Sequence, residues 1–108
     1  MEQRLDARKL RPGGYKAMLG LEAYVGGCGL EQPLLELVKI RASQINGCAF
    51  CLAMHVEEAR KLGESDDRTH MLSAWREAPS YSARERAALA WAEAVTLVVE
   101  THVPDEVY

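Results

Sequence analysis

Long apolar runs, an excess of basic residues and an apolar leader are all missing from this sequence. No stretch approaches the roughly 18 uninterrupted apolar residues that a membrane-spanning helix needs. The 13 basic side chains are outnumbered by 16 acidic ones, and the net charge of −3 argues against a nucleic-acid partner. The N-terminal residues MEQRLDARKLR contain no apolar segment, so we expect no signal peptide and a cytoplasmic location.

Cysteine is also scarce, with three residues at Cys28, Cys48 and Cys51. A disulfide-stapled fold uses more cysteines in an even number, so the chain is not of that class. Cys48 and Cys51 lie three residues apart. In a reducing compartment, this spacing indicates redox chemistry or metal binding rather than a structural staple.

The length of 108 residues, 48% of them hydrophobic, predicts a single domain over residues 1–108. A domain of this size buries enough apolar surface to fold without a disulfide or a metal.

The four prolines and eight glycines act as punctuation between segments with helical periodicity. No segment alternates apolar and polar residues over the length of a strand. We therefore predict an all-α protein of about five helices, with helical segments at about 15–25, 32–45, 48–62, 65–78 and 82–98.

The expected helix boundaries rest on capping residues. Asn46-Gly47 stops the second segment, Ser65 caps the fourth, and Ser82 with Glu85 forms a capping box for the fifth. Residues 103–108 resemble the start of another helix, with a proline early and acids after it. We therefore expect the chain to lack the last helices of its domain, and to expose apolar surface that a partner subunit covers.

The most informative residues are Cys48, Cys51 and His55, which the spacing i, i+3, i+7 places on one helix face. The preceding Asn46-Gly47 places both cysteines in the first helical turn, where the helix dipole favours a thiolate. His55 lies one turn beyond Cys51 and can act as its base. Cysteines at i and i+3 can close a disulfide, so one thiol can attack and the other can resolve.

Two other interpretations of these residues stay open: inert packing of two small core residues, and metal binding. A structural zinc site needs four ligands, and the fourth would have to come from Glu36, His70 or Cys28 without a second recognisable pair. Haem attachment is excluded because it needs CxxCH, and a thioredoxin-like domain needs strands before its CxxC.

The run ELVKIRASQINGCAFCLAMH, from Glu36 to His55, resembles the AhpD-like alkylhydroperoxidase core of the carboxymuconolactone decarboxylase family. Ala59-Arg60 with Gly63, and later Leu72-x-x-Trp75, Tyr81-Ser82 and ERAALA from Glu85, extend the resemblance over nearly the whole chain. It implies an AhpD-like helical bundle that forms a homo-oligomer (dimer, trimer or hexamer).

The resemblance also implies a thiol-dependent peroxidase that uses no cofactor, metal or haem. Cys51 would attack the hydroperoxide and become a sulfenic acid, and Cys48 would resolve it to a disulfide. A dithiol electron donor would then attack Cys48. Glu36 and His55 would relay the proton away from Cys51. The family's best-studied peroxidases carry a histidine where this chain has Phe50, which predicts a more apolar site.

Two alternative functions remain at this point: decarboxylation of a lactone, which does not rely on a cysteine pair, and a non-catalytic oligomer whose disulfide senses redox state. Other residues are expected in ordinary roles. Cys28 is an incidental thiol, His70, His102 and Arg41 are surface residues, and Trp75 and Trp91 are core or oligomer contacts.

Overall fold

The computed structural model describes residues 4–108, which form helices and no strand. The chain divides into two compact units, Met1–Leu30 and Glu31–Tyr108, which are described separately. The predicted all-α class is confirmed for the described residues. No helix in this part of the chain combines the length and the apolar character that a membrane span requires.

Unit 1 contains α1 (Ala7–Leu10) and α2 (Pro12–Gly26). Asp6 caps α1 by accepting a hydrogen bond from the Arg8 backbone N–H at 3.1 Å. Pro12 begins α2, where its missing N–H leaves no unpaired donor. Helix α2 covers the predicted 15–25 and extends it at both ends, whereas α1 was not predicted. Neither helix contains a buried residue.

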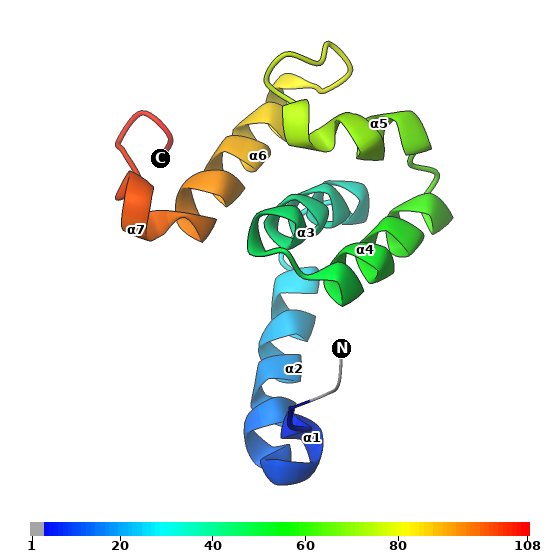
Figure 1. The fold of residues 1–108 in the computed structure, drawn as a ribbon, viewed down its shortest axis with the longest axis vertical. Helices are drawn as coiled ribbons and strands as arrows, with labels where there is room; N and C mark the ends of the chain where they lie inside the picture. Colours follow the sequence, from blue (N-terminus) through cyan, green and yellow to red (C-terminus); the bar gives the residue numbers. More distant parts are fainter. Residues whose placement is uncertain (1–3) are drawn as a thin grey trace. The chain divides into compact units, whose positions relative to one another are not determined.

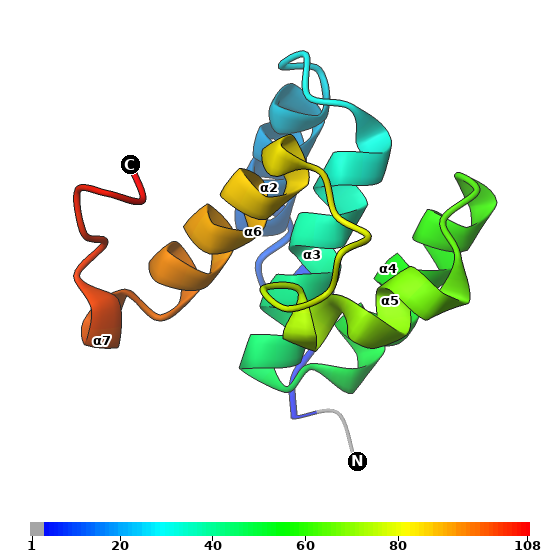
Figure 2. The same ribbon diagram turned by 90° about the horizontal axis from the view of Figure 1, so that it is seen from above.

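Unit 2 is built around α3, which contacts α4, α6 and a short 3-10 helix (Figures 1 and 2). The helices of this unit, in order, are α3 (Gln32–Asn46), α4 (Ala49–Lys61), α5 (Asp66–Met71), the 3-10 helix Leu72–Ala74, α6 (Ala83–Thr96) and α7 (Val98–Thr101).

The core of unit 2 is small and aliphatic at its centre. Leu37 and Ile40 of α3, Leu72 of the 3-10 helix and Leu89 of α6 are fully buried. Around them pack Ala59, Trp75, Ala78 and Tyr81. Helix α3 supplies two of the four central side chains. It therefore packs against the other helices of the unit, which hold it in position.

The predicted caps are present. The Ser65 hydroxyl accepts from the Arg68 backbone N–H at 3.3 Å and starts α5. Ser82 and Glu85 form the full capping box at the start of α6. Gly47 ends α3 in the left-handed conformation, with φ 64°. Local sequence signals therefore place the starts of α5 and α6 and the stop of α3 correctly.

Two predicted helix ends are wrong. Helix α5 ends at Met71, and a 3-10 helix continues only to Ala74 instead of reaching residue 78. Helix α6 ends at Thr96 rather than continuing through Val98. The Thr96 hydroxyl donates to the Ala92 carbonyl at 2.6 Å, a back-bond that often bends a helix, and a β-branched run follows.

Residues 103–108 form a turn instead of the start of a helix. His102 and Val103 both have positive φ, at 52° and 48°, a conformation that a helix cannot include. The turn closes with a hydrogen bond from the Val107 N–H to the Pro104 carbonyl at 3.0 Å. The left-handed pair after α7 therefore redirects the chain before a helix can begin.

Candidate redox site

Cys48 is the N-cap of α4, directly after the left-handed Gly47. Its sulfur accepts a hydrogen bond from the Cys51 backbone N–H at 3.2 Å. Both cysteines therefore lie in the first turn of α4, as the sequence predicts. Free N–H groups and the positive end of the helix dipole favour negative charge on sulfur at this position.

Cys48 and Cys51 are joined by a disulfide, with their Cα atoms 5.3 Å apart. Both residues are half-buried, so the bond lies at the edge of the unit. Phe50 lies between them and is 78% exposed. Its ring is therefore turned toward solvent and does not bury the cysteine pair. Cys28 is free and exposed, in keeping with the incidental role predicted for it.

Glu36 and His55 meet where α3 packs against α4. Glu36 Oε2 lies 2.9 Å from His55 Nδ1, and Glu36 is only 6% exposed. An ionised carboxylate can only accept, so Nδ1 then carries the proton and donates it. The other ring nitrogen, Nε2, is left as an acceptor. His55 lies one turn beyond Cys51, so helix spacing places its ring on the face of α4 that carries this cysteine.

Lys39 is a member of this cluster that the sequence pattern did not single out. Its Nζ lies 3.6 Å from Glu36 Oε1, so each oxygen of the carboxylate has its own partner. The i, i+3 spacing of Glu36 and Lys39 on one helix was a usable signal for this pair.

A second polar cluster lies on the other side of α3. Glu93 of α6 accepts from Arg41 Nε and from Trp75 Nε1, both at 2.8 Å, and also pairs with Arg76. Burial opposes ionisation of Glu93, but the hydrogen bonds from Trp75, Arg76 and Arg41 outweigh it and hold its pKa below the usual value.

This cluster corrects the prediction for Arg41. Its side chain is half-buried and pairs with Glu93 inside the unit, so it is not an exposed basic residue. His70 and His102 are exposed, as predicted. Trp75 is a core residue, whereas Trp91 is exposed and contacts Tyr108 edge-on, with ring centroids 5.8 Å apart.

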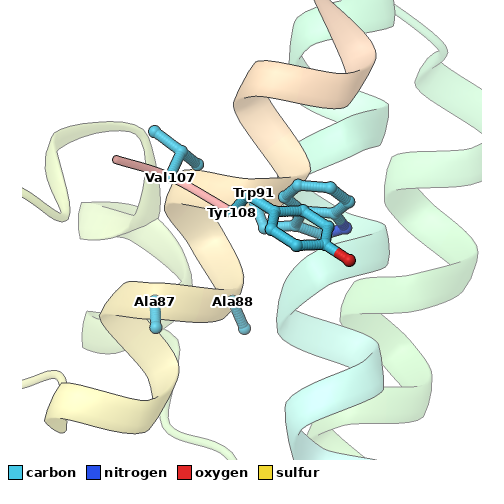
Figure 3. A pocket seen from close by; sticks show the side chains of 5 residues that line it. All are labelled: Ala87, Ala88, Trp91, Val107 and Tyr108. Carbon is cyan, nitrogen blue, oxygen red and sulfur yellow. The ribbon is translucent and has the colours of Figure 1, made fainter. Parts of the chain in front are cut away.

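A pocket of about 360 Å³, whose lining includes neither cysteine of the pair, lies beside α6 (Figure 3). It is lined by Ala87, Ala88, Trp91, Val107 and Tyr108. These residues supply one phenol hydroxyl and no nucleophile, carboxylate or histidine. The chemistry-bearing side chains gather at the start of α4, and so we place the candidate site there.

Metal binding was one of the interpretations that the sequence left open. Among residues 4–108, no three His, Cys, Asp or Glu side chains are arranged to hold a metal ion. The residues that pair are instead two cysteines in a disulfide, and the buried Glu36 with the half-buried His55. Such an arrangement could supply a sulfur nucleophile, a resolving sulfur and a group that takes up a proton.

The chain is similar in sequence and in structure to known proteins. YdfG of Bacillus subtilis (strain 168), an uncharacterized protein, is 44% identical over 108 residues, which is all of this chain and 74% of YdfG. A crystal structure from Agrobacterium tumefaciens superposes with a TM-score of 0.92 at 46% identity, over 98% of this chain and 73% of that one. That protein is of unknown function, and a role as the antioxidant defence protein AhpD has been suggested for it. The model of the carboxymuconolactone decarboxylase family matches residues 12–94, most of the chain. The chain therefore belongs to the carboxymuconolactone decarboxylase family and has its AhpD-like fold.

Proposed function

We propose that this protein is a thiol-dependent peroxidase that reduces hydroperoxides with Cys51 and Cys48. The observation that carries the proposal is the disulfide at the start of α4, a helix that also carries His55, which pairs with the buried Glu36. The family membership and the suggested antioxidant role of the Agrobacterium protein support it.

The cycle begins with the reduced pair. His55 takes the proton of Cys51, and the thiolate attacks the terminal oxygen of the hydroperoxide. The O–O bond breaks, the alkoxide takes a proton and leaves as an alcohol, and Cys51 becomes a sulfenic acid. The Cys48 thiolate then attacks the Cys51 sulfur, the S–O bond breaks as the disulfide forms, and the departing hydroxide takes a proton and leaves as water.

A dithiol donor completes the cycle. Its first thiolate attacks Cys48, which forms a mixed disulfide and releases the Cys51 thiolate. Its second thiol attacks the mixed disulfide and releases Cys48. The donor leaves oxidised, and the two electrons have passed from the donor to the peroxide. Cys48 is the N-cap of α4, a position that favours a thiolate. This supports its role as the attacking group when the disulfide forms and as the leaving group when the mixed disulfide is resolved.

The three cysteines allow a matched test. In a coupled assay with an alkyl hydroperoxide and a dithiol donor, we expect Cys51→Ser to abolish turnover. Cys48→Ser is expected to stop after one turnover and to leave a Cys51 sulfenic acid that a sulfenic-acid trap labels. Cys28→Ser is the control, because this thiol is exposed and unpaired with another cysteine. Equal rates in wild type and Cys51→Ser would contradict the proposal.

We also propose that the protein works as a homo-oligomer. Helix α2 buries none of its residues within the chain, although Met18, Leu21 and Val25 recur along it at helical spacing. A helix of this length is marginally stable without tertiary packing, so its apolar side chains call for a partner surface.

A further inference from the structure

We propose that Lys39 is a positioning residue of the redox site, which holds Glu36 so that Glu36 can orient His55. The inference rests on the proposed peroxidase function, and it assigns a role to a residue that the reaction scheme above does not use. The observation behind it is the chain of contacts from Lys39 Nζ through both oxygens of Glu36 to His55 Nδ1.

The first step of the argument is the burial of Glu36. A carboxylate that is 6% exposed has lost most of its water, so its negative charge needs compensation from the protein. Oε2 receives this compensation from the His55 ring at 2.9 Å. Oε1 receives it from the Lys39 ammonium at 3.6 Å, so that the two partners stand on opposite oxygens.

The second step concerns the geometry that Lys39 imposes. Glu36 and Lys39 lie on successive turns of α3, and the Ser43 hydroxyl donates to the Lys39 carbonyl at 2.7 Å. The backbone of Lys39 therefore belongs to α3, the helix that supplies Leu37 and Ile40 to the core. An ammonium held beside Oε1 restricts rotation of the carboxylate, which keeps Oε2 directed at Nδ1.

The third step is the protonation cycle of His55. When Cys51 gives up its proton, the imidazole becomes an imidazolium and needs an ionised carboxylate at Nδ1. The Lys39 ammonium contacts the opposite oxygen of Glu36, so Oε2 stays directed at Nδ1 when the proton arrives. It also favours the tautomer in which Nδ1 carries the proton and Nε2 is free to accept one.

The test compares Lys39→Met, which keeps the apolar stem and removes the charge, with Lys39→Arg, which keeps the charge. Lys61→Met is the matched control, because Lys61 makes the same i, i+3 contact with a glutamate on an exposed surface. Reduced protein is examined by ¹⁵N NMR of the imidazole rings, which is tractable because the chain has three histidines. Turnover of an alkyl hydroperoxide is measured on the same samples.

We expect the wild type to show His55 as a single tautomer protonated at Nδ1, and Lys39→Met to show a mixture. In Lys39→Met, kcat should fall about tenfold while KM changes less than about twofold, since a positioning residue supplies part of what a base contributes. Lys39→Arg should restore the His55 signature and most of kcat. Lys61→Met should resemble wild type in both measurements.

An unchanged His55 signature in Lys39→Met would overturn the assignment, as would equal losses of kcat in the Met and Arg variants. A wild type that consumes no hydroperoxide would contradict the proposed function instead. The NMR comparison does not depend on turnover, and so it would still decide whether Lys39 positions His55.

Discussion

Glu93 receives more hydrogen bonds from side chains distant in the sequence than Glu36 does. Arg41, Trp75 and Arg76 all donate to it, and they come from α3 and from the segment before α6. If the carboxylate were lost, the buried Trp75 N–H and the half-buried Arg41 guanidinium would lose this acceptor, whereas the exposed Arg76 could turn to solvent. A buried donor that has no acceptor destabilises the fold by more than one hydrogen bond stabilises it. We therefore expect Glu93 to contribute to stability rather than to a reaction.

Replacing Glu93 by Gln tests this. We expect a loss of about 2–3 kcal/mol in the free energy of unfolding near pH 7, since the amide pairs poorly with the two arginines. Glu58→Gln, which alters an exposed ion pair, should change it by less than about 0.5 kcal/mol. Urea titration of the reduced proteins measures both values, and similar losses in the two variants would contradict the assignment.

The pH dependence of the same variants gives a second check. The folded pKa of Glu93 is lowered, so its contribution to stability is present above the unfolded pKa of about 4.3. That contribution is lost as the pH falls through the lower folded value. The difference in free energy of unfolding between wild type and Glu93→Gln should therefore shrink steadily below about pH 4. A difference that stays constant down to about pH 2 would contradict this role of Glu93.

At this scale the sequence predicted local relations better than distant ones. The first-turn position of Cys48 and Cys51 followed from their spacing after Asn46-Gly47. The Arg41–Glu93 contact did not, because it joins residues 52 apart and depends on how α3 packs on α6. The contact between Glu36 and His55 likewise depends on the packing of α3 on α4, and Glu36 was singled out through the family resemblance.

At the scale of elements, the turn between α3 and α4 sets the direction of α4, the helix that begins at the cysteine pair. Gly47 has φ 64°, and the Cys48 N–H donates to the Ser43 carbonyl at 3.1 Å to close the turn. A methyl group at Gly47 would meet no atom within 4 Å. The requirement for glycine is therefore conformational and not a matter of space.

This predicts that Gly47→Ala lowers the free energy of unfolding by about 1 kcal/mol or more, because alanine avoids the left-handed region. Gly47→Asn should lower the free energy of unfolding by about half as much, since asparagine tolerates the left-handed region better than alanine does. Thermal unfolding of oxidised and reduced forms supplies the measurement. Equal losses for the two variants would indicate a steric rather than a conformational cause.

Helix starts were more predictable than helix ends. A start is marked by one side chain that bonds to a nearby N–H, as at Ser65 and Ser82. An end is marked only where a left-handed glycine is needed, as at Gly47. The end of α6 and the turn after Val103 depend on back-bonding and on non-glycine residues with positive φ, for which the sequence carries no clear mark.

At the scale of the whole molecule, unit 1 has helices without a core. All residues of α2 are exposed within the chain, including Met18 at 66%. Composition and periodicity predicted the helix but located no packing partner for it, because packing partners depend on tertiary contacts. The proposed homo-oligomer supplies that partner from a second copy.

We expect the combined substitution Met18→Glu and Leu21→Glu to shift the protein toward monomer by at least tenfold in dissociation constant, about 1.4 kcal/mol. Buried glutamates without partners are costly at an apolar interface. Lys16→Glu also adds negative charge to α2 but removes no apolar side chain, so it is the control. Sedimentation velocity at several concentrations measures the equilibrium, and a wild type that is monomeric throughout would contradict the proposal.

The position of Glu36 on the core helix has a consequence for how this protein can diversify. Residues 34–37 are all buried, so a change beside Glu36 also disturbs the packing that keeps the unit folded. On α4, by contrast, Phe50, Ala53 and Met54 are exposed beside the disulfide. Mutational tolerance around the site is therefore one-sided. For the proposed peroxidase, new substrate preferences would arise through the exposed residues of α4, while the side that carries Glu36 is constrained by the packing that folds the chain.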